Sequence, residues 1–126
     1  MYLPKTPTFI QQLFPELLCR VAGEGNVVYL TFDDGPTPGV TEEVLDVLAQ
    51  YNAKATFFCL GRQVALHPEL YDRIIAEGHR VGNHSYSHPD GWRTDTHKYL
   101  QDVAAAETII DTNIFRPPYG RLRPAQ

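Results

Sequence analysis

Short strand-like runs alternate with helix-like segments along this chain, and that alternation limits the folds it can adopt. Four β-branched or apolar runs predict strands, at 26–32, 55–60, 79–83 and 114–116. Three segments between them predict helices, at 41–48, 68–77 and 96–111. Strands that alternate with helices form right-handed βαβ units around a parallel sheet, so the chain belongs to the α/β class.

The apolar pattern also predicts which side chains face the core. The near-continuous apolar run 26–32 is typical of a strand that is buried on both faces. Thr41 is the predicted N-cap of the first helix. The predicted inward positions of the three helices are Val44, Leu45, Val47 and Leu48, then Leu70, Ile74 and Ile75, then Leu100, Val103, Ala104, Ile109 and Ile110.

The length of 126 residues allows one domain with one modest core. A closed (β/α)₈ barrel usually takes about 200 residues or more. We therefore expect only about the first four βα units of a larger domain here, in residues 26–126, preceded by an N-terminal segment, 1–25. Residues 9–20 of that segment predict a short helix interrupted at Pro15.

The composition excludes several classes of function. A formal net charge of −4 gives no sign of the basic face that nucleic-acid binding requires. No apolar stretch approaches the roughly 18 residues that a transmembrane helix needs. Prolines and polar residues interrupt the N-terminal apolar run, so no export signal is expected there. Cys59 lies in an apolar run and predicts a buried free thiol, although a disulfide with Cys19 stays open.

Polar residues follow three of the four predicted strands: Asp33-Asp34, His84 to His88, and Arg116 to Tyr119. The carboxyl ends of parallel strands lie at one edge of a sheet, where active sites gather. We therefore expect these three clusters to meet in a single site.

Within this site, His84 and His88 are four residues apart, which places both imidazoles on one face of a helix or helical turn. Two histidines and one of the two adjacent carboxylates, Asp33 or Asp34, could hold a cation and leave coordination positions open for water and substrate. The cation would lower the pKa of bound water, and the other carboxylate would take the proton. Taken singly, the His84/His88 pair favours surface histidines and the Asp33-Asp34-Gly35-Pro36 run favours a simple turn; only together do they favour a metal site.

Other chemistries fit the sequence less well. A zincin would need a glutamate where Ser85 stands, and the iron oxygenases with two histidines and one carboxylate generally use β-sandwich frameworks. Ser85 and Ser87 are predicted to bind local backbone groups, because no nucleophile elbow surrounds them. The other histidines, His67, His79 and His97, are predicted to be surface or structural residues.

Three ordered motifs resemble those of the polysaccharide deacetylase (NodB-type) family, carbohydrate esterase family four. They are Thr31-Phe32-Asp33-Asp34-Gly35-Pro36, His84-Ser85-Tyr86-Ser87-His88 and Arg116-Pro117-Pro118-Tyr119-Gly120. The resemblance runs from about Val27 to Gly120. It implies an irregular parallel (β/α) barrel and a hydrolase that removes N-acetyl groups from an amino-sugar polymer, either peptidoglycan or a chitin-like glycan.

The resemblance also implies a role for each matching residue. Asp33 would be the general base, and Arg116 would orient it. Asp34, His84 and His88 would hold a divalent metal, zinc foremost, with cobalt, manganese or nickel as alternatives. Pro117 and Tyr119 would line the sugar groove, and the Tyr119 backbone N–H would stabilise the oxyanion.

The family pattern normally continues with an Asp/Trp-bearing segment and a Leu-x-His segment whose histidine acts as the general acid. Neither follows Gly120 in this sequence, and Trp92 lies too early to match. We therefore expect a truncated domain with an open sheet edge, which another chain could cover in an oligomer. The alternative is an inactive or truncated remnant that binds metal or carbohydrate. Acetylated glycans suggest the cell envelope or the exterior as the location.

Overall fold

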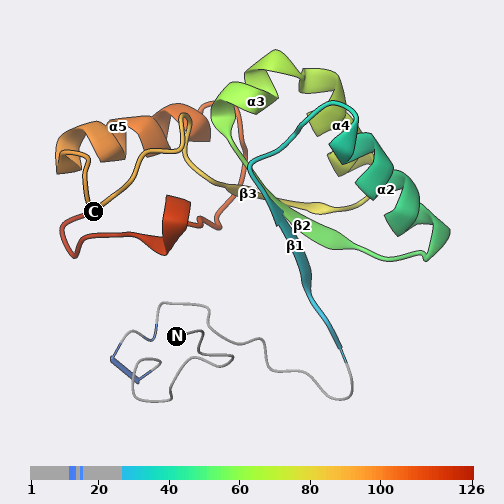
Figure 1. Cartoon of the computed structure of the whole chain (residues 1–126), viewed down its shortest axis with the longest axis horizontal. Coiled ribbons are helices and arrows are strands. Elements are labelled where there is room, and N and C mark those ends of the chain that lie inside the picture. The colour runs from blue at the N-terminus through green and yellow to red at the C-terminus, as the bar shows by residue number, and fades with distance from the viewer. Residues whose placement is uncertain (1–11, 14, 16–26) are drawn as a thin grey trace.

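The computed structural model describes residues 12, 13, 15 and 27–126, so most of the predicted helix 9–20 lies outside the described residues. Helices lie along one side of a small sheet, and the C-terminus lies near the last of them (Figure 1). The elements in chain order are β1 (Leu30–Asp33), α2 (Val40–Gln50), β2 (Ala55–Cys59), α3 (Gly61–Leu66), α4 (Pro68–Ala76), β3 (Arg80–Asn83), α5 (Thr96–Glu107) and the 3₁₀ turn η1 (Pro118–Gly120).

The sheet is parallel, which confirms the predicted α/β class. Its strand order is β1-β2-β3, with Leu30 opposite Ala55 and Thr56 opposite Arg80. The fourth predicted strand is reduced to one parallel bridge between Phe115 and Asn83. That bridge is enough to bring Arg116 alongside the end of β3.

The side chains of the central strand β2 pack on both faces of the sheet. Ala55, Phe57 and Cys59 alternate toward the helices and join the core there with α2, α3 and α4. Phe58 points to the other face, and Gly82 on β3 makes room for it. A Cβ at Gly82 would come within 2.5 Å of the Phe58 ring, so only glycine fits at this position.

The three predicted helices are found in place as α2, α4 and α5, but the structure corrects several details. Helix α3 was not predicted, because its six residues are too short to show a helical period. Thr41 is not the N-cap of α2: Gly39 is, with φ 81, and the buried Thr41 hydroxyl accepts a hydrogen bond from the Thr37 N–H (2.7 Å). Glycine adopts that backbone angle without steric cost.

Several predicted core positions are also wrong. Val47, Ile75, Leu100, Ala104 and Ile109 are exposed. Helix α5 ends at Glu107 instead of residue 111 and buries Tyr99 and Ala106. Its outward face carries Leu100, because only one narrow stripe of this helix contacts the rest of the described chain.

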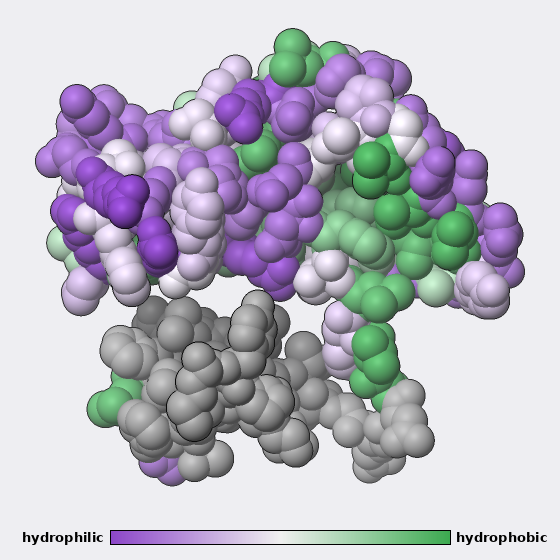
Figure 2. All heavy atoms as spheres, in the orientation of Figure 1, coloured by the Kyte–Doolittle hydropathy of each residue, from purple (hydrophilic) through white to green (hydrophobic). Residues whose placement is uncertain are grey.

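The apolar run before and within β1 is exposed, contrary to the prediction of a strand buried on both faces. Val28 is 80% exposed, and Val27, Tyr29 and Leu30 are also exposed. Figure 2 shows this apolar surface running along β1 and beside α2. Within residues 27–126, β1 pairs with β2 alone, so nothing in that range covers its other edge.

Cys59 is a buried free thiol, as predicted, whereas Cys19 lies outside the described residues. Burial raises the pKa of the Cys59 thiol from 9.0 to about 12. In a Cys19→Ser variant we expect Cys59 to resist iodoacetamide at pH 8 until the protein is denatured. The folded protein keeps the Cys59 thiol protonated at that pH, and burial keeps the reagent away from the sulfur. Mass spectrometry measures this, and fast alkylation of the native protein would contradict it.

The same shift has a consequence for stability. The folded protein keeps the Cys59 proton above pH 9, where the unfolded chain loses it. The contribution of this pKa shift to folding stability is therefore fully present below about pH 9 and is lost as the pH rises toward 12.

Among the helices that the structure describes, none is long and apolar enough to cross a membrane.

Candidate metal and catalytic site

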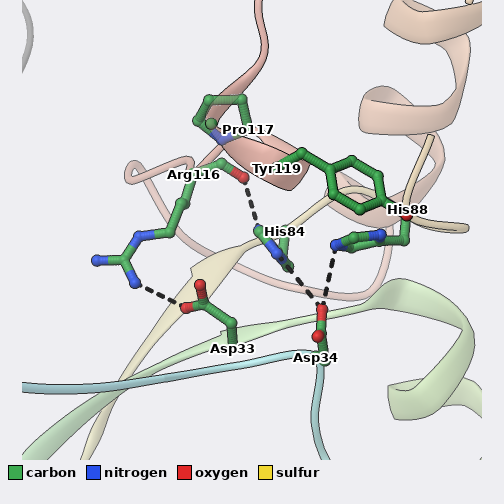
Figure 3. Close-up of a pocket in the computed structure, with 8 residues that line it drawn as sticks. Asp33, Asp34, His84, His88, Arg116, Pro117 and Tyr119 are labelled. Carbon is green, nitrogen blue, oxygen red and sulfur yellow. Dashed lines mark hydrogen bonds and ion pairs between the residues drawn. The ribbon is translucent and has the colours of Figure 1, made fainter. Parts of the chain in front are cut away.

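The three polar clusters meet at the carboxyl edge of the sheet, as predicted. Asp33 is the last residue of β1, His84 directly follows β3, and Arg116 follows the bridge at Phe115. They border a cleft of about 530 Å³ (Figure 3). The cleft is lined by Asp33, Asp34, His84, His88, Arg116, Pro117, Tyr119 and Gly120.

Asp34, His84 and His88 form a group that could hold a metal ion. Asp34 Oδ1 lies 3.2 Å from His88 Nε2 and 3.5 Å from His84 Nε2. The three donor atoms lie within 4.8 Å of one another. Figure 3 shows both imidazoles pointing toward the Asp34 carboxylate. The set has three protein ligands, the number that catalytic zinc sites commonly use.

The hydrogen bond of His84 fixes its tautomer. Its Nδ1–H donates to the carbonyl oxygen of Arg116 (2.7 Å), which leaves the Nε2 lone pair directed at Asp34. Burial lowers the pKa of His84, although the bond to Arg116 and the two aspartates oppose that effect. Two electron-pair donors, Nε2 and a carboxylate oxygen, then face each other, and a shared cation would relieve their repulsion. The donor chemistry of these residues therefore fits a divalent metal.

The two histidines do not lie on a helix or helical turn, contrary to the sequence prediction. Residues 84–88 form a loop in which Ser85 and His88 have positive φ angles, 71 and 66. Asn83 Oδ1 accepts from the Ser85 N–H (2.7 Å), and Ser85 Oγ accepts from the His88 N–H (3.1 Å). These local bonds hold the left-handed residues in place, and Ser85 satisfies a backbone group as predicted.

Asp102 on α5 is a residue that the sequence analysis missed. Its Oδ1 accepts from the backbone N–H groups of Tyr86 (2.8 Å) and Ser87 (2.9 Å). Its Oδ2 accepts from the Ser87 hydroxyl at 2.5 Å. Asp102 thus fixes the loop between the two histidines from outside the cleft. An acid in the middle of a predicted helix gave no signal that it would reach another segment.

We expect Asp102→Ala to weaken Zn²⁺ binding by about 10–100-fold, the usual cost of losing a group that orients metal ligands. The three lost hydrogen bonds would let His88 move relative to Asp34. Titration calorimetry measures the affinity, with far-UV circular dichroism to confirm the fold. Glu107→Ala, an exposed acid on the same helix, is the matched control. Equal Zn²⁺ affinities for the two variants would contradict this role.

Asp33 makes a different contact from its neighbour Asp34. Arg116 Nη1 donates to Asp33 Oδ1 (2.7 Å) and to Thr31 Oγ1 (3.0 Å). The guanidinium carbon of Arg116 also lies 3.9 Å from the centre of the Phe58 ring. Thr31 on β1 and the buried ring of Phe58 on β2 therefore both orient Arg116, and Arg116 holds the Asp33 carboxylate. No role was predicted for Phe58, because its place within the predicted strand 55–60 gives no signal that its ring would contact Arg116.

Tyr119 and Pro117 form one wall of the cleft. The ring of Tyr119 packs edge-on against His88, with 4.5 Å between the ring centres, and remains 64% exposed. The backbone of Tyr119 is left-handed, with φ 58. Both residues line the cleft, and their expected role in a sugar groove stays a prediction.

The remaining histidines lie outside the cleft. His79 is buried, and its Nδ1 accepts a hydrogen bond from the Ala55 N–H (3.3 Å). His67 lies 3.8 Å from Glu69, and His97 is exposed. These positions agree with the prediction of surface or structural roles.

Known proteins match this chain over most of its length. The family model described as polysaccharide deacetylase matches residues 20–125. A chitooligosaccharide deacetylase from Rhizobium leguminosarum bv. trifolii is 57% identical over 83 residues, which are 66% of this chain and 39% of that protein. A peptidoglycan-N-acetylglucosamine deacetylase from Bacillus cereus is 42% identical over 101 residues, which are 75% of this chain and 37% of that protein.

A solved structure gives the same result for the fold. The peptidoglycan deacetylase PdaC from Bacillus subtilis matches with a TM-score of 0.74 at 40% identity, over 82% of this chain and 55% of that chain. The chain thus spans about half the length, or less, of these three proteins. The match confirms the predicted fold class.

Proposed function

The chain belongs to the polysaccharide deacetylase family, and we propose that it carries the metal-binding and water-activating part of a site that removes N-acetyl groups from an amino-sugar polymer. The observation that carries this proposal is the convergence of Asp34, His84 and His88, with a second carboxylate, Asp33, held beside them by Arg116. Residues 26–126 would be the N-terminal portion of the deacetylase domain, and residues 1–25 would precede it.

Asp34, His84 and His88 would hold the cation, with zinc as the proposed metal. When bound there, a divalent cation supplies Lewis acidity and lowers the pKa of a ligated water toward neutrality. Two imidazole nitrogens and one carboxylate oxygen would suit zinc, although cobalt, manganese or nickel can use the same ligands.

Other residues of the cleft would accept the proton, orient the base and contact the sugar. Asp33 is the general base that accepts a proton as water attacks the acetyl carbonyl carbon. Arg116 keeps the Asp33 carboxylate turned toward the cleft. Pro117 and the exposed Tyr119 ring border the space that the sugar would occupy, and the Tyr119 N–H would stabilise charge on the carbonyl oxygen. Hydrolysis consumes one water, breaks the amide C–N bond and yields acetate and a free amine.

The proposed substrate is a polymer that contains N-acetylglucosamine. The relatives compared above are named for peptidoglycan and for chitooligosaccharides, and both glycans carry this sugar. Removing an acetyl group from either exposes an amine. The shared acetamido group is therefore what we propose that the cleft recognises.

An acetate-release assay tests this function. Because the general acid is expected in a later segment of the domain, the chain is extended to a whole deacetylase domain, loaded with zinc and incubated with N-acetylglucosamine oligomers and, separately, with peptidoglycan. Released acetate is measured against a metal-free sample. Acetate release that depends on zinc is the expected result. Zinc and glycan binding without any acetate would instead support the alternative, a binding module without turnover.

A further inference from the structure

An exposed aromatic row continues outward from the cleft. The ring of Tyr119 packs against His88 on one side, and the guanidinium of Arg121 lies 5.6 Å from the Tyr119 ring on the other. The same guanidinium lies 5.1 Å from the ring of Trp92. Tyr119, Arg121 and Trp92 thus form a continuous surface that begins at the proposed metal ligands. We call these three residues the aromatic row.

The backbone that carries Trp92 is held firmly. Asp90 accepts a hydrogen bond from the Trp92 N–H (3.0 Å) and pairs with Arg121 through its other oxygen. Arg123 donates to the Trp92 carbonyl. Gly91 is buried so closely that a Cβ there would collide with the Arg121 carbonyl. These contacts tie residues 90–92 to residues 121–123 and fix the backbone from which the indole projects.

Despite these contacts, the Trp92 side chain is 58% exposed. Tryptophan is among the largest apolar side chains, so leaving it in water forgoes stabilisation that burial would supply. A rigid backbone that presents an exposed indole and an exposed phenol is the arrangement expected of a contact surface for a ligand. Neither ring is required by the chemistry of the metal site.

We propose that Trp92, together with Arg121, forms a subsite for the sugar residue next to the one whose acetyl group is removed. The apolar C–H face of a pyranose ring stacks on an aromatic face, and Arg121 can donate hydrogen bonds to hydroxyl or acetamido oxygens. Asp90 already pairs with Arg121, so the surface suits an uncharged sugar. This inference rests on the proposed function, since it takes an amino-sugar polymer as the ligand.

The sequence offers a direct probe, because Trp92 is the single tryptophan of the chain. Intrinsic fluorescence is recorded while N-acetylglucosamine and its tetramer are titrated without added metal, so that turnover does not consume the ligand. We expect the tetramer to shift or quench the emission in a saturable way and the monosaccharide to leave it unchanged. Calorimetry measures tetramer binding independently.

Variants complete the test. Trp92→Ala is expected to weaken tetramer binding on the order of tenfold, comparable with the loss of one stacked ring, while Trp92→Phe keeps most of the affinity. Tyr51→Ala removes another exposed aromatic side chain, at the end of α2 and outside the residues that line the cleft, and is the matched control, which should bind as the parent does. Circular dichroism checks the fold of each variant.

The failure of this subsite is distinguishable from the failure of the proposed function. If the tetramer binds by calorimetry but leaves Trp92 emission unchanged, or if Trp92→Ala and the parent bind it equally, the subsite is overturned even when acetate is released. Absence of any tetramer binding overturns it as well. A saturable Trp92 response without acetate release would support the subsite and count against the enzyme.

Discussion

Asp33→Asn is expected to lower acetate release by about 10²–10⁴-fold, the usual contribution of a general base, while Zn²⁺ affinity stays close to that of the parent. The reason lies in the different directions of two neighbouring carboxylates. Asp33 turns to Arg116 at 2.7 Å, whereas Asp34 turns to the histidines at 3.2 and 3.5 Å (Figure 3). Asparagine preserves the shape of Asp33 and can accept from Arg116, but it is not a base.

Acetate release and calorimetric Zn²⁺ binding are measured on the same preparations. The control is Asp46→Asn, which makes the same chemical change in another surface ion pair, with Arg73 at 2.6 Å on the far side of the helices. That variant should retain full activity. If Asp33→Asn instead lost the metal, the division of roles between Asp33 and Asp34 would be wrong.

The meeting of the three motifs could be predicted because it depends on topology alone. Strands in a parallel sheet place their carboxyl ends at one edge, so Asp33, His84 and Arg116 had to converge once the βαβ pattern was recognised. The strand register places the three motifs at the same level of the sheet. Asp33 lies opposite Phe58, and Phe58 lies opposite Gly82, two residues before His84. The alternation of strands and helices predicted the α/β class, and the resemblance to the NodB-type family implied the barrel type; the comparisons confirm both.

The loop between the histidines could not be predicted, because tertiary contacts determine its shape. The i, i+4 spacing of His84 and His88 suggested helical geometry, yet the backbone passes through two left-handed residues. Asp102, fourteen positions beyond His88, stabilises that path by three hydrogen bonds. Spacing shows that two side chains can approach each other, but it does not show which backbone brings them together.

The prediction of which helix residues are buried failed for a related physical reason. A periodic stripe of apolar residues predicts one inward face, and α5 carries apolar residues on more than one side. Tyr99 and Ala106 are buried, whereas Leu100, next to Tyr99, is exposed. The choice between two apolar stripes depends on which neighbours the helix has. The sequence of the helix does not contain that information.

His84→Ala is expected to abolish measurable Zn²⁺ binding, the largest effect on the metal site that a single change would have. The substitution removes one of three donors and also the Nδ1–H bond that ties the loop to the Arg116 carbonyl (2.7 Å). Loss of a group that only orients a ligand costs about 10–100-fold in affinity, so the loss of a ligand should cost more. Calorimetry measures the affinity.

Because His84 is 3% exposed, His84→Ala could also disturb the fold, and His88→Ala provides a second variant at a less buried ligand. It should lose Zn²⁺ binding to a similar extent, with an unchanged far-UV spectrum. His97→Ala, at an exposed histidine on α5, makes the same chemical change outside the cleft and should bind Zn²⁺ normally. If His84→Ala and His88→Ala both bound Zn²⁺ as the parent does, the cation would not be held by the imidazoles of His84 and His88. Asp33 would then lie beside no metal, and its assignment as the base that activates water would lose its foundation.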